Sequence, residues 1–354
     1  MYRVVVCGTG NVGRHALRSI VDHPDLELAG VRAYTAAKRG TDAGDLIGTG
    51  RTGVTCVVDL DDVLKTEADC VCYTALGSTV PGGFDRTLDE LCTLLRAGFN
   101  VTSSALEHLV HPAILPDALR RLSDACAAGQ SSFYDTGINP GFTMDLWPIT
   151  MSRLSRTIDQ LRVTEVVDMC RYDSGMARDF MGFGLPAGDR PIDAMHRDSP
   201  RSPFYASLRQ VADAMGLTLS DVRYERAVAI TDKPVDVAIG TLEPGTVAAL
   251  KMMFIGVVDG RDFLVNSWVW RMSDDVAPEW PTGDQWILEI DGDPQVRSSF
   301  ALSTTFDARR PVSLTVATLN VNAIPALCRA APGVQTNLTL PVLAGGYPSW
   351  STVA

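Results

Sequence analysis

The residues best suited to bind a cofactor form a glycine-rich turn near the N-terminus, Gly8-Thr9-Gly10-Asn11-Val12-Gly13. The turn follows a β-branched run and opens a segment whose apolar residues recur with helical spacing. Here Gly8 permits the tight turn, Gly10 lets a pyrophosphate approach the backbone, and Gly13 allows close helix–strand packing. The phosphates are expected on the N-terminal amides of the helix. A chance glycine-rich turn is the alternative, but this context favours dinucleotide binding.

The end of the second expected strand, near residue 32, indicates which dinucleotide is bound. A strict NAD site carries Asp or Glu there for the ribose 2′-hydroxyl. This chain instead places cationic and hydroxyl side chains over residues 31–39, namely Arg32, Thr35, Lys38 and Arg39. Cations suit a 2′-phosphate, which Arg can contact bidentately. We therefore predict NADP(H) as the preferred cofactor and NAD(H) as a second one, with a solvated basic loop as the alternative.

Two further segments are expected to line the cofactor because each follows a predicted strand. Thr74-Ala75-Leu76 would lie on the adenosine or ribose side. Asn139-Pro140-Gly141 follows the sixth strand, where Asn139 could bond the nicotinamide carboxamide and Gly141 permits close backbone approach. An ordinary Asn-Pro turn is the alternative. Asn322, on a later helical segment, is a further candidate contact, and a helix-surface residue is the rival interpretation.

The elements that must position these residues alternate in type along the first part of the chain. Apolar runs at 2–7, 26–31, 54–58, 69–74, 99–102 and 131–134 predict strands, and helical spacing predicts helices over 11–22, 86–96 and 112–128. Such alternation predicts an α/β fold with a doubly wound parallel sheet, a Rossmann domain. Between 36 and 53 glycines interrupt the rhythm, which suggests a loop with a functional or lid-like role.

After about residue 142 the pattern changes. Strand-like runs at 224–231, 235–242, 247–258, 263–272 and 286–290 predict a second α+β domain built on a mostly antiparallel sheet. Residues 311–331 return to a helical pattern that Pro325 breaks. We therefore predict a dinucleotide-binding domain over 1–142, with 311–345 packing back on it, and a substrate-binding and dimerisation domain over 143–310.

Composition narrows the partners. The chain has 354 residues and a formal net charge of −11, which argues against nucleic acid and an anionic membrane surface as main partners. No apolar run approaches the ~20 residues of a membrane span, and the N-terminus lacks signal-peptide features, so we expect a cytoplasmic protein. The spacing of the cysteines and histidines is not typical of a metal site, and none is predicted.

Residues 40–54 read GTDAGDLIGTGRTGV. Together with the glycine-rich turn, this loop resembles that of dihydrodipicolinate reductases, and the resemblance covers the N-terminal third. Those reductases also carry a paired-His motif followed by Lys, and a Pro-Ser-Gly-Thr loop, and this sequence has neither. The resemblance therefore implies the N-terminal fold without the reductase activity.

Four segments are similar to the 2,4-diaminopentanoate dehydrogenases and the NAD(P)-dependent native amine dehydrogenases. They are residues 3–14, NPGF at 139–142, DDVAP at 274–278 and NAIPA at 322–326, which together span nearly the whole chain. This resemblance implies an enzyme that interconverts a primary amine with a ketone or aldehyde plus ammonia by hydride transfer.

The same resemblance implies a catalytic glutamate after the fifth strand, and Glu107 occupies that place. Such a position lies beyond the carboxyl ends of the strands, where ligands of open α/β sheets bind. An alkylammonium of pKa ~10 must lose a proton before hydride leaves its carbon, so a general base is needed. The alternative is structural, because Ser104-x-x-Glu107 is also a capping box.

The substrate pocket is less determined by the sequence. Its candidates are apolar residues near the expected domain junction: Phe142, Trp147, Met169, Tyr172 and Met176. Such side chains are more often core, and if they line a pocket, the substrate has a hydrophobic body and few polar handles. Expected partners are a small-molecule amine or carbonyl, ammonia, and a second copy of the chain in a homodimer. The alternatives are an imine or carbonyl reductase and a non-catalytic dinucleotide sensor.

Overall fold

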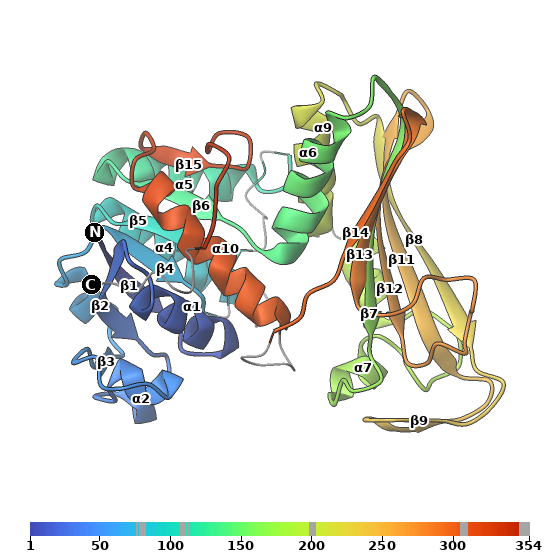
Figure 1. The fold of residues 1–354 in the computed structure, drawn as a ribbon, viewed down its shortest axis with the longest axis horizontal. Coiled ribbons are helices and arrows are strands. Elements are labelled where there is room, and N and C mark those ends of the chain that lie inside the picture. Colours follow the sequence, from blue (N-terminus) through green and yellow to red (C-terminus); the bar gives the residue numbers. More distant parts are fainter. Residues whose placement is uncertain are drawn as a thin grey trace. The chain divides into compact units, whose positions relative to one another are not determined.

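The computed structural model describes residues 1–75, 77, 83–106, 111, 113–197, 203–304 and 311–346, and the chain divides into two units (Figure 1). The first unit comprises Met1–Phe142 with Thr304–Ala354, and the second comprises Thr143–Ser303. The first unit therefore takes its residues from both ends of the chain. Within the ranges described, no helix has the length and apolar character needed to span a bilayer.

The first unit is built on a parallel seven-stranded sheet with the order β15-β6-β5-β4-β1-β2-β3. The central position of β1, with crossovers to either side, is that of a doubly wound dinucleotide-binding sheet, and it confirms the predicted fold. The strands are β1 (Tyr2–Cys7), β2 (Leu26–Arg32), β3 (Cys56–Val57), β4 (Cys70–Tyr73), β5 (Asn100–Ser103), β6 (Ser132–Asp135) and β15 (Gly333–Gln335).

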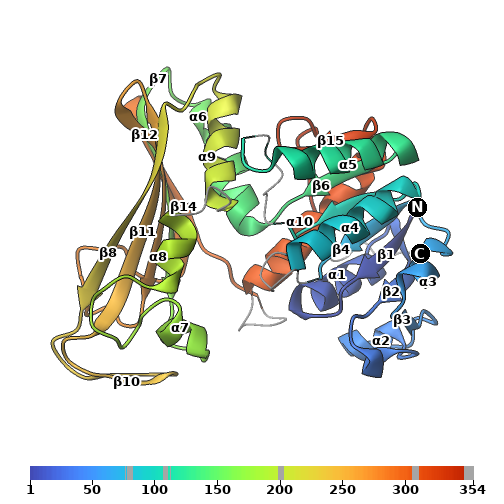
Figure 2. The same ribbon diagram turned by 180° about the vertical axis from the view of Figure 1, so that it is seen from behind.

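Helices cover both faces of this sheet (Figures 1 and 2). Because side chains alternate along a strand, Val4 and Val6 of β1 pack with α1 and α10, whereas Val5 and Cys7 pack with α4 and α5. The helical segments are α1 (Asn11–Val21), η1 (Ala36–Lys38), α2 (Ala43–Ile47), α3 (Leu60–Leu64), α4 (Gly83–Arg96), α5 (Pro116–Gly129) and α10 (Pro311–Leu327).

The predicted break at Pro325 is wrong, because α10 continues through Pro325 to Leu327. A proline inside a helix removes the bond to the carbonyl of the residue four positions earlier. Here only Ala326 and Leu327 follow it, so little of the helix depends on that bond.

The glycine-interrupted loop is ordered around the carboxylate of Asp42, which is buried. Its Oδ1 accepts from the Gly44 N–H (2.8 Å), the Thr52 N–H (2.9 Å) and the Thr52 hydroxyl (3.0 Å), and its Oδ2 accepts from the Gly53 N–H (3.0 Å). These bonds, the one from the Thr52 N–H above all, lower the pKa of Asp42. The loop is thus tied to its own carboxylate, and a lid-like role stays a prediction.

The second unit is built on a mixed six-stranded sheet with the order β14-β13-β7-β12-β11-β8. β7 and β12 run parallel and the other neighbours run antiparallel, which confirms the prediction of a mostly antiparallel sheet. A separate ladder joins β9 to β10. The strands are β7 (Thr157–Asp168), β8 (Asp221–Ile230), β9 (Val235–Val237), β10 (Gly240–Leu242), β11 (Val247–Val258), β12 (Arg261–Arg271), β13 (Gln285–Asp293) and β14 (Val296–Phe300).

Two expectations for this unit are wrong in detail. Residues 235–242, expected as one strand, form β9 and β10, and Gly240 with φ +108° allows the chain to reverse between them. The central strand β7 was not expected, because its apolar alternation shifts register after Val163, so that the next apolar residue is Val166.

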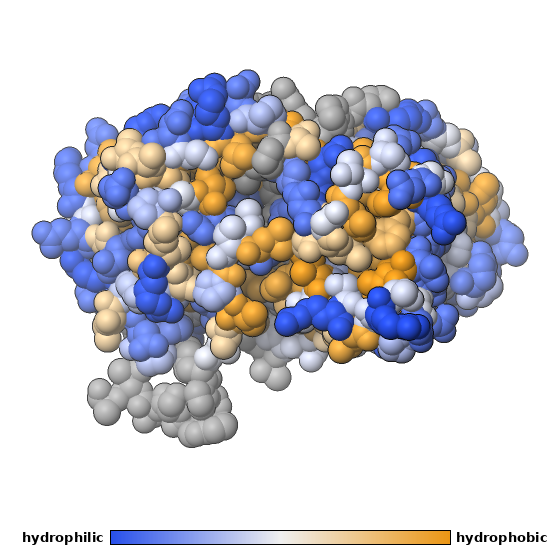
Figure 3. Space-filling model, turned by 90° about the horizontal axis from the view of Figure 1, so that it is seen from above, coloured by the Kyte–Doolittle hydropathy of each residue, from blue (hydrophilic) through white to orange (hydrophobic). Residues whose placement is uncertain are grey.

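Helices α6 (Trp147–Ser152), α7 (Gly175–Asp179), α8 (Pro191–Arg197) and α9 (Pro203–Ala214) gather on one face of this sheet (Figures 1 and 2). On that face Phe254 and Trp268 meet Phe204 of α9, with ring centroids 5.0 Å and 4.1 Å away. Met253 and Ile255, one position before and after Phe254, therefore point to the opposite face, which we call the open sheet face. In the view of Figure 3, hydrophobic residues are interspersed with hydrophilic ones over both units.

Candidate active site

The glycine-rich turn has the geometry that the sequence predicts for it. Gly8 has φ +111°, and a Cβ on it would lie 2.8 Å from the Ala75 nitrogen. A Cβ on Gly13 would lie 2.0 Å from the Gly8 carbonyl oxygen, so only glycine allows this approach of helix to strand. A Cβ on Gly10 would meet nothing within 4 Å. The turn is thus tight at its base and open where a pyrophosphate would lie.

Helix α1 presents its N-terminus beside this open space. Its N-cap is Gly10, which has no side chain to accept from the first amides, and the first turn contains no acidic residue. Its first amides, beginning with those of Asn11 and Val12, are therefore placed to receive an anion. Thr74, directly after β4, supports the turn, because its N–H donates to the Cys7 carbonyl (2.7 Å) and its hydroxyl lies 3.4 Å from the Gly8 carbonyl. The next predicted residues are Ala75, which is half-buried, and Leu76, which lies outside the described residues.

The predicted cations after β2 differ in what they contact. The Lys38 ammonium lies 3.0 Å from both the carbonyl oxygen and the hydroxyl of Thr9, within the glycine-rich turn. The exposed Arg39 instead donates to Asp59 (2.6 Å). Thr35 is exposed and caps η1 without a side-chain bond. Of these residues, Lys38 is the one that the structure brings to the turn.

Arg32, the last residue of β2, is buried and engaged by a carboxylate that the sequence did not indicate. Its Nη1 and Nη2 donate to Glu90 of α4, at 2.9 Å and 3.2 Å, and its Nε donates to the Val58 carbonyl at 3.1 Å. The hydroxyls of Tyr34 and Tyr73 also donate to Glu90, both at 2.7 Å. Burial alone would raise the pKa of Glu90, but the bonds from Arg32, Tyr34 and Tyr73 outweigh it and lower that pKa.

The carboxyl ends of β5 and β6 are tied together just before the predicted base. The Thr136 N–H donates to the Ser103 carbonyl (2.8 Å), and the Ser103 hydroxyl accepts from the Ala105 N–H (3.0 Å). The Leu106 N–H lies 3.4 Å from the buried Asp135 carboxylate. Glu107 itself lies outside the described residues.

The capping-box alternative for Glu107 requires a helix that begins directly after Ser104. Ala105 and Leu106 are bends rather than helix, and α5, the next helix among the residues that the structure describes, begins at Pro116. Ser104 therefore does not cap a helix at these two residues.

The Asn139-Pro140-Gly141 turn follows β6. The Asn139–Pro140 peptide bond is cis, and Gly141 has φ +129°, a conformation that favours glycine. The predicted partner from α10, Asn322, lies against the C-terminal segment, where its Oδ1 is 3.4 Å from the Gly346 nitrogen. The buried Asn320, which the sequence did not indicate, instead donates to the Thr136 carbonyl (3.2 Å) at the end of β6.

The predicted substrate residues divide between the two units. Phe142 is half-buried at the end of the first-unit segment, and Trp147 begins α6 and packs edge-on against Phe300 at 5.0 Å. Met169 and Trp147 are both buried, at 6% and 9% exposed. Tyr172 and Met176 are 38% and 51% exposed, which leaves these two side chains free to contact a small molecule.

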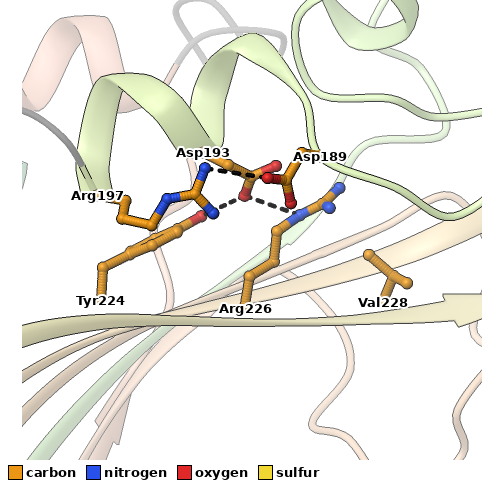
Figure 4. Close-up of a pocket in the computed structure, with 6 residues that line it drawn as sticks. All are labelled: Asp189, Asp193, Arg197, Tyr224, Arg226 and Val228. Atoms are coloured by element: carbon orange, nitrogen blue, oxygen red, sulfur yellow. Dashed lines mark hydrogen bonds and ion pairs between the residues drawn. The ribbon is translucent and has the colours of Figure 1, made fainter.

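A cavity of about 220 Å³ lies elsewhere in the second unit, between α8 and β8 (Figure 4). The Asp193 carboxylate accepts from the Tyr224 hydroxyl (2.9 Å) and lies 3.3 Å from Arg226, while Arg197 pairs with Asp189 (3.0 Å). The two acidic and two basic side chains that line the cavity therefore balance each other in charge. None of the predicted substrate residues lines this cavity. Among the residues described, no group of three His, Cys, Asp or Glu side chains could hold a metal ion.

Comparison with known proteins identifies the family. A model of the 2,4-diaminopentanoate dehydrogenase C-terminal domain matches residues 142–349, and a model of the dihydrodipicolinate reductase N-terminus matches residues 2–81. An amine dehydrogenase of Streptomyces virginiae is 31% identical over 352 residues, covering 97% of each chain. The chain belongs to the family of amine dehydrogenases and 2,4-diaminopentanoate dehydrogenases.

A second relative agrees with this, and two solved structures share the fold. The 2,4-diaminopentanoate dehydrogenase of Acetoanaerobium sticklandii is 25% identical, over 96% of this chain and 93% of its own. An amine dehydrogenase structure from Mycobacterium smegmatis has a TM-score of 0.75 at 21% identity, covering 97% of each chain. An oxidoreductase from Agrobacterium radiobacter has a TM-score of 0.55 at 9% identity, over 96% and 92%. The resemblance seen in the sequence is thus confirmed, and the protein is an oxidoreductase of this family with a Rossmann domain for a dinucleotide.

Proposed function

We propose that this enzyme interconverts a primary amine with a ketone or aldehyde plus ammonia, with NADP(H) as the preferred cofactor and Glu107 as the general base. The observation that carries the proposal is the similarity to the Streptomyces virginiae amine dehydrogenase over 97% of both chains. The local geometry of the first unit supports both the cofactor site and the position of the base.

The cofactor would be held by the glycine-rich turn and by the first amides of α1. Gly10 leaves open space, and Gly8 and Gly13 allow the chain to close behind it. The Lys38 ammonium, on Thr9, adds a positive charge beside the phosphates. When bound, NADP⁺ would accept the hydride that leaves the carbon bearing the amine.

Glu107 would take a proton from the substrate ammonium, which makes the nitrogen lone pair available to expel hydride from the neighbouring carbon. In the direction of amination the same carboxylate would hold the proton that the new amine receives. The bond from the Leu106 N–H to Asp135 supports this role, because it fixes the backbone one residue before Glu107 at the carboxyl ends of β5 and β6. Ligands of doubly wound sheets bind at that edge.

The substrate would be an amine with a hydrophobic body. Tyr172 and Met176 are the predicted pocket residues with exposed surface, and both are apolar over most of their length. Phe142, Trp147 and Met169 stay candidates for the pocket wall. The Asn139-Pro140-Gly141 turn would contact the nicotinamide end of the cofactor, with Asn322 as a weaker candidate.

We also propose a homodimer that pairs through the open sheet face. Helices gather on the other face of the second sheet, while on this one the half-buried Met253 packs against Ile255, Val257 and Val265, which are 4%, 6% and 3% exposed. An antiparallel sheet usually buries at least one apolar face, and a second copy of the same face gives a self-complementary contact.

The decisive experiment follows NADPH oxidation with a panel of ketones and aldehydes, with and without ammonium. Amine dehydrogenation predicts turnover that requires both the carbonyl and ammonia. Turnover without ammonia would contradict the proposal in favour of a carbonyl or imine reductase. Binding of NADPH without turnover on any carbonyl, by protein whose thermal midpoint is intact, would favour a non-catalytic dinucleotide sensor.

A further inference from the structure

The side chain that the sequence offers for a 2′-phosphate, Arg32, is held by a carboxylate on a different element. Glu90 lies on α4, far from β2 in the sequence, yet its two oxygens accept from both terminal nitrogens of Arg32. The two side chains are 8% and 15% exposed. We propose that Glu90 is a specificity-determining residue that weakens the binding of NADP(H) relative to NAD(H). This inference rests on the proposed use of NADP(H).

The geometry leaves Arg32 few donors for a ligand. The edge formed by Nη1 and Nη2 faces the Glu90 carboxylate, and Nε donates to the Val58 carbonyl at 3.1 Å. Nη1 also donates to the Tyr34 hydroxyl at 3.0 Å. Both edges from which a guanidinium makes a bidentate contact are therefore occupied, and a 2′-phosphate must displace a partner to be gripped in that way.

Displacement of Glu90 is unfavourable for two reasons. The carboxylate is mostly buried, and if Arg32 turned away, the Tyr34 and Tyr73 hydroxyls would remain as its hydrogen-bond donors, without a positive charge. The 2′-phosphate would also bring a second negative charge close to Glu90, which raises the cost further. A ribose that carries a 2′-hydroxyl neither has to displace Glu90 nor brings a negative charge close to it. Glu90 therefore penalises NADP(H) and leaves NAD(H) unaffected.

The test is direct binding of NADP⁺ and NAD⁺, without an amine substrate, to the wild-type protein and to Glu90→Gln. Gln keeps the length of the side chain and an oxygen that accepts from the tyrosines, but it removes the charge. The matched control is Asp89→Asn, the adjacent carboxylate of α4, which pairs with Arg121 instead. The double variant Arg32→Ala with Glu90→Gln and the single variant Arg32→Ala complete a double-mutant cycle.

The expected result is that Glu90→Gln binds NADP⁺ about tenfold more tightly and leaves the Kd of NAD⁺ within about twofold. Asp89→Asn should change neither, and Glu90→Gln should have no effect on the ratio of the two Kd values when Arg32 is already Ala. An unchanged ratio in Glu90→Gln, a weaker affinity for NADP⁺, or a shift that persists without Arg32 would each overturn the inference.

A second variant and the wild-type affinities for the two cofactors make the test decisive. If Glu90→Gln does not fold, Glu90→Asp loosens the same fork by one methylene and should shift the ratio in the same direction by a smaller factor; a ratio equal to that of the wild type would then overturn the inference. A wild-type protein that binds NAD⁺ as tightly as NADP⁺ would contradict the proposed cofactor preference instead. The change in the ratio on substitution would still measure the effect of Glu90.

Discussion

The ammonium of Lys38 lies 3.0 Å from the hydroxyl and 3.0 Å from the carbonyl oxygen of Thr9. Lys38 belongs to η1 after β2, and Thr9 belongs to the glycine-rich turn after β1. The contact therefore places a positive charge from the segment after β2 on the glycine-rich turn. Arg39, the next residue, makes its ion pair with Asp59 instead.

Lys38→Ala should weaken NADP⁺ binding by about 10- to 100-fold, because it removes the positive charge that would lie beside the cofactor phosphates. Arg39→Ala is the matched control and should change the Kd by less than about twofold, since Arg39 is exposed and paired with Asp59. Isothermal titration calorimetry with both variants measures the effect. Equal losses in the two variants would show that the basic loop acts only through its net charge.

Glu107→Gln should slow hydride transfer from an amine by ~10²–10⁴-fold, because the amide cannot accept the ammonium proton. The affinity for NADP⁺ and the thermal midpoint should stay at their wild-type values. Single-turnover measurement of NADPH formation isolates this step. Near wild-type turnover would reject the role of Glu107 as the base.

Arg271→Ala should lower the free energy of unfolding by about 3–5 kcal/mol. The Arg271 side chain is 1% exposed, and it donates to the carbonyls of Asp274 and Ala277, both at 3.1 Å, and to that of Val276. It therefore orders the DDVAP segment at 274–278. Arg297→Ala, whose side chain is 73% exposed in a pair with Glu289, is the control and should change the value by less than about 0.5 kcal/mol. Urea denaturation of the two variants checks this, and similar losses would contradict it.

Acid should destabilise the second unit through His196. Burial lowers the pKa of His196 to about 4, and its ring packs against those of Phe204, Tyr224 and Phe254. As pH falls from about 6.5 toward 4, the unfolded chain binds a proton that the folded chain does not, so stability is lost, by up to about 3 kcal/mol. Above about pH 6.5 His196 is neutral in both states and has no effect.

The measurement is urea denaturation of the wild type and of His196→Phe at about pH 7.5 and about pH 5. The wild type should lose more stability between these pH values than the variant does. Equal losses would show that other groups account for the pH dependence.

Met253→Glu should convert a dimer into monomers, because it places a charge on the open sheet face. Met195→Glu makes the same change on α8, where the side chain is 45% exposed, and should leave the dimer intact. Sedimentation velocity distinguishes the two. A monomeric wild type, or a Met253→Glu protein that stays dimeric, would contradict pairing through this face.

The features that were predictable depend on residues close together in the chain. The glycine-rich turn and the strands and helices around it follow from local spacing, and the sheet order then follows from general rules of α/β folds. The pair between Arg32 and Glu90 was not predictable in this way, because it depends on how α4 packs beside the end of β2. Nothing in the pattern of α4 marks Glu90, which stands between apolar neighbours of the buried stripe, Leu88 and Leu91.

In the second unit the same limit applies. β11 is a long apolar run and was predicted with the bounds that it has. β7 was missed because its polar residues face both sides, and β15 because it has only three residues. The helical pattern does not distinguish Asn320 from Asn322, because both lie on one apolar helix. Only the packing of α10 brings Asn320 to the carbonyl that follows β6.

The division of the first unit between the two ends of the chain determines the order in which the protein can fold during synthesis. The sheet lacks β15, and the core around Val4 and Val6 lacks α10, until residues 311–335 have left the ribosome. The second unit is one continuous stretch and is complete before that point. It can therefore acquire its structure while the nucleotide-binding unit is still unfinished.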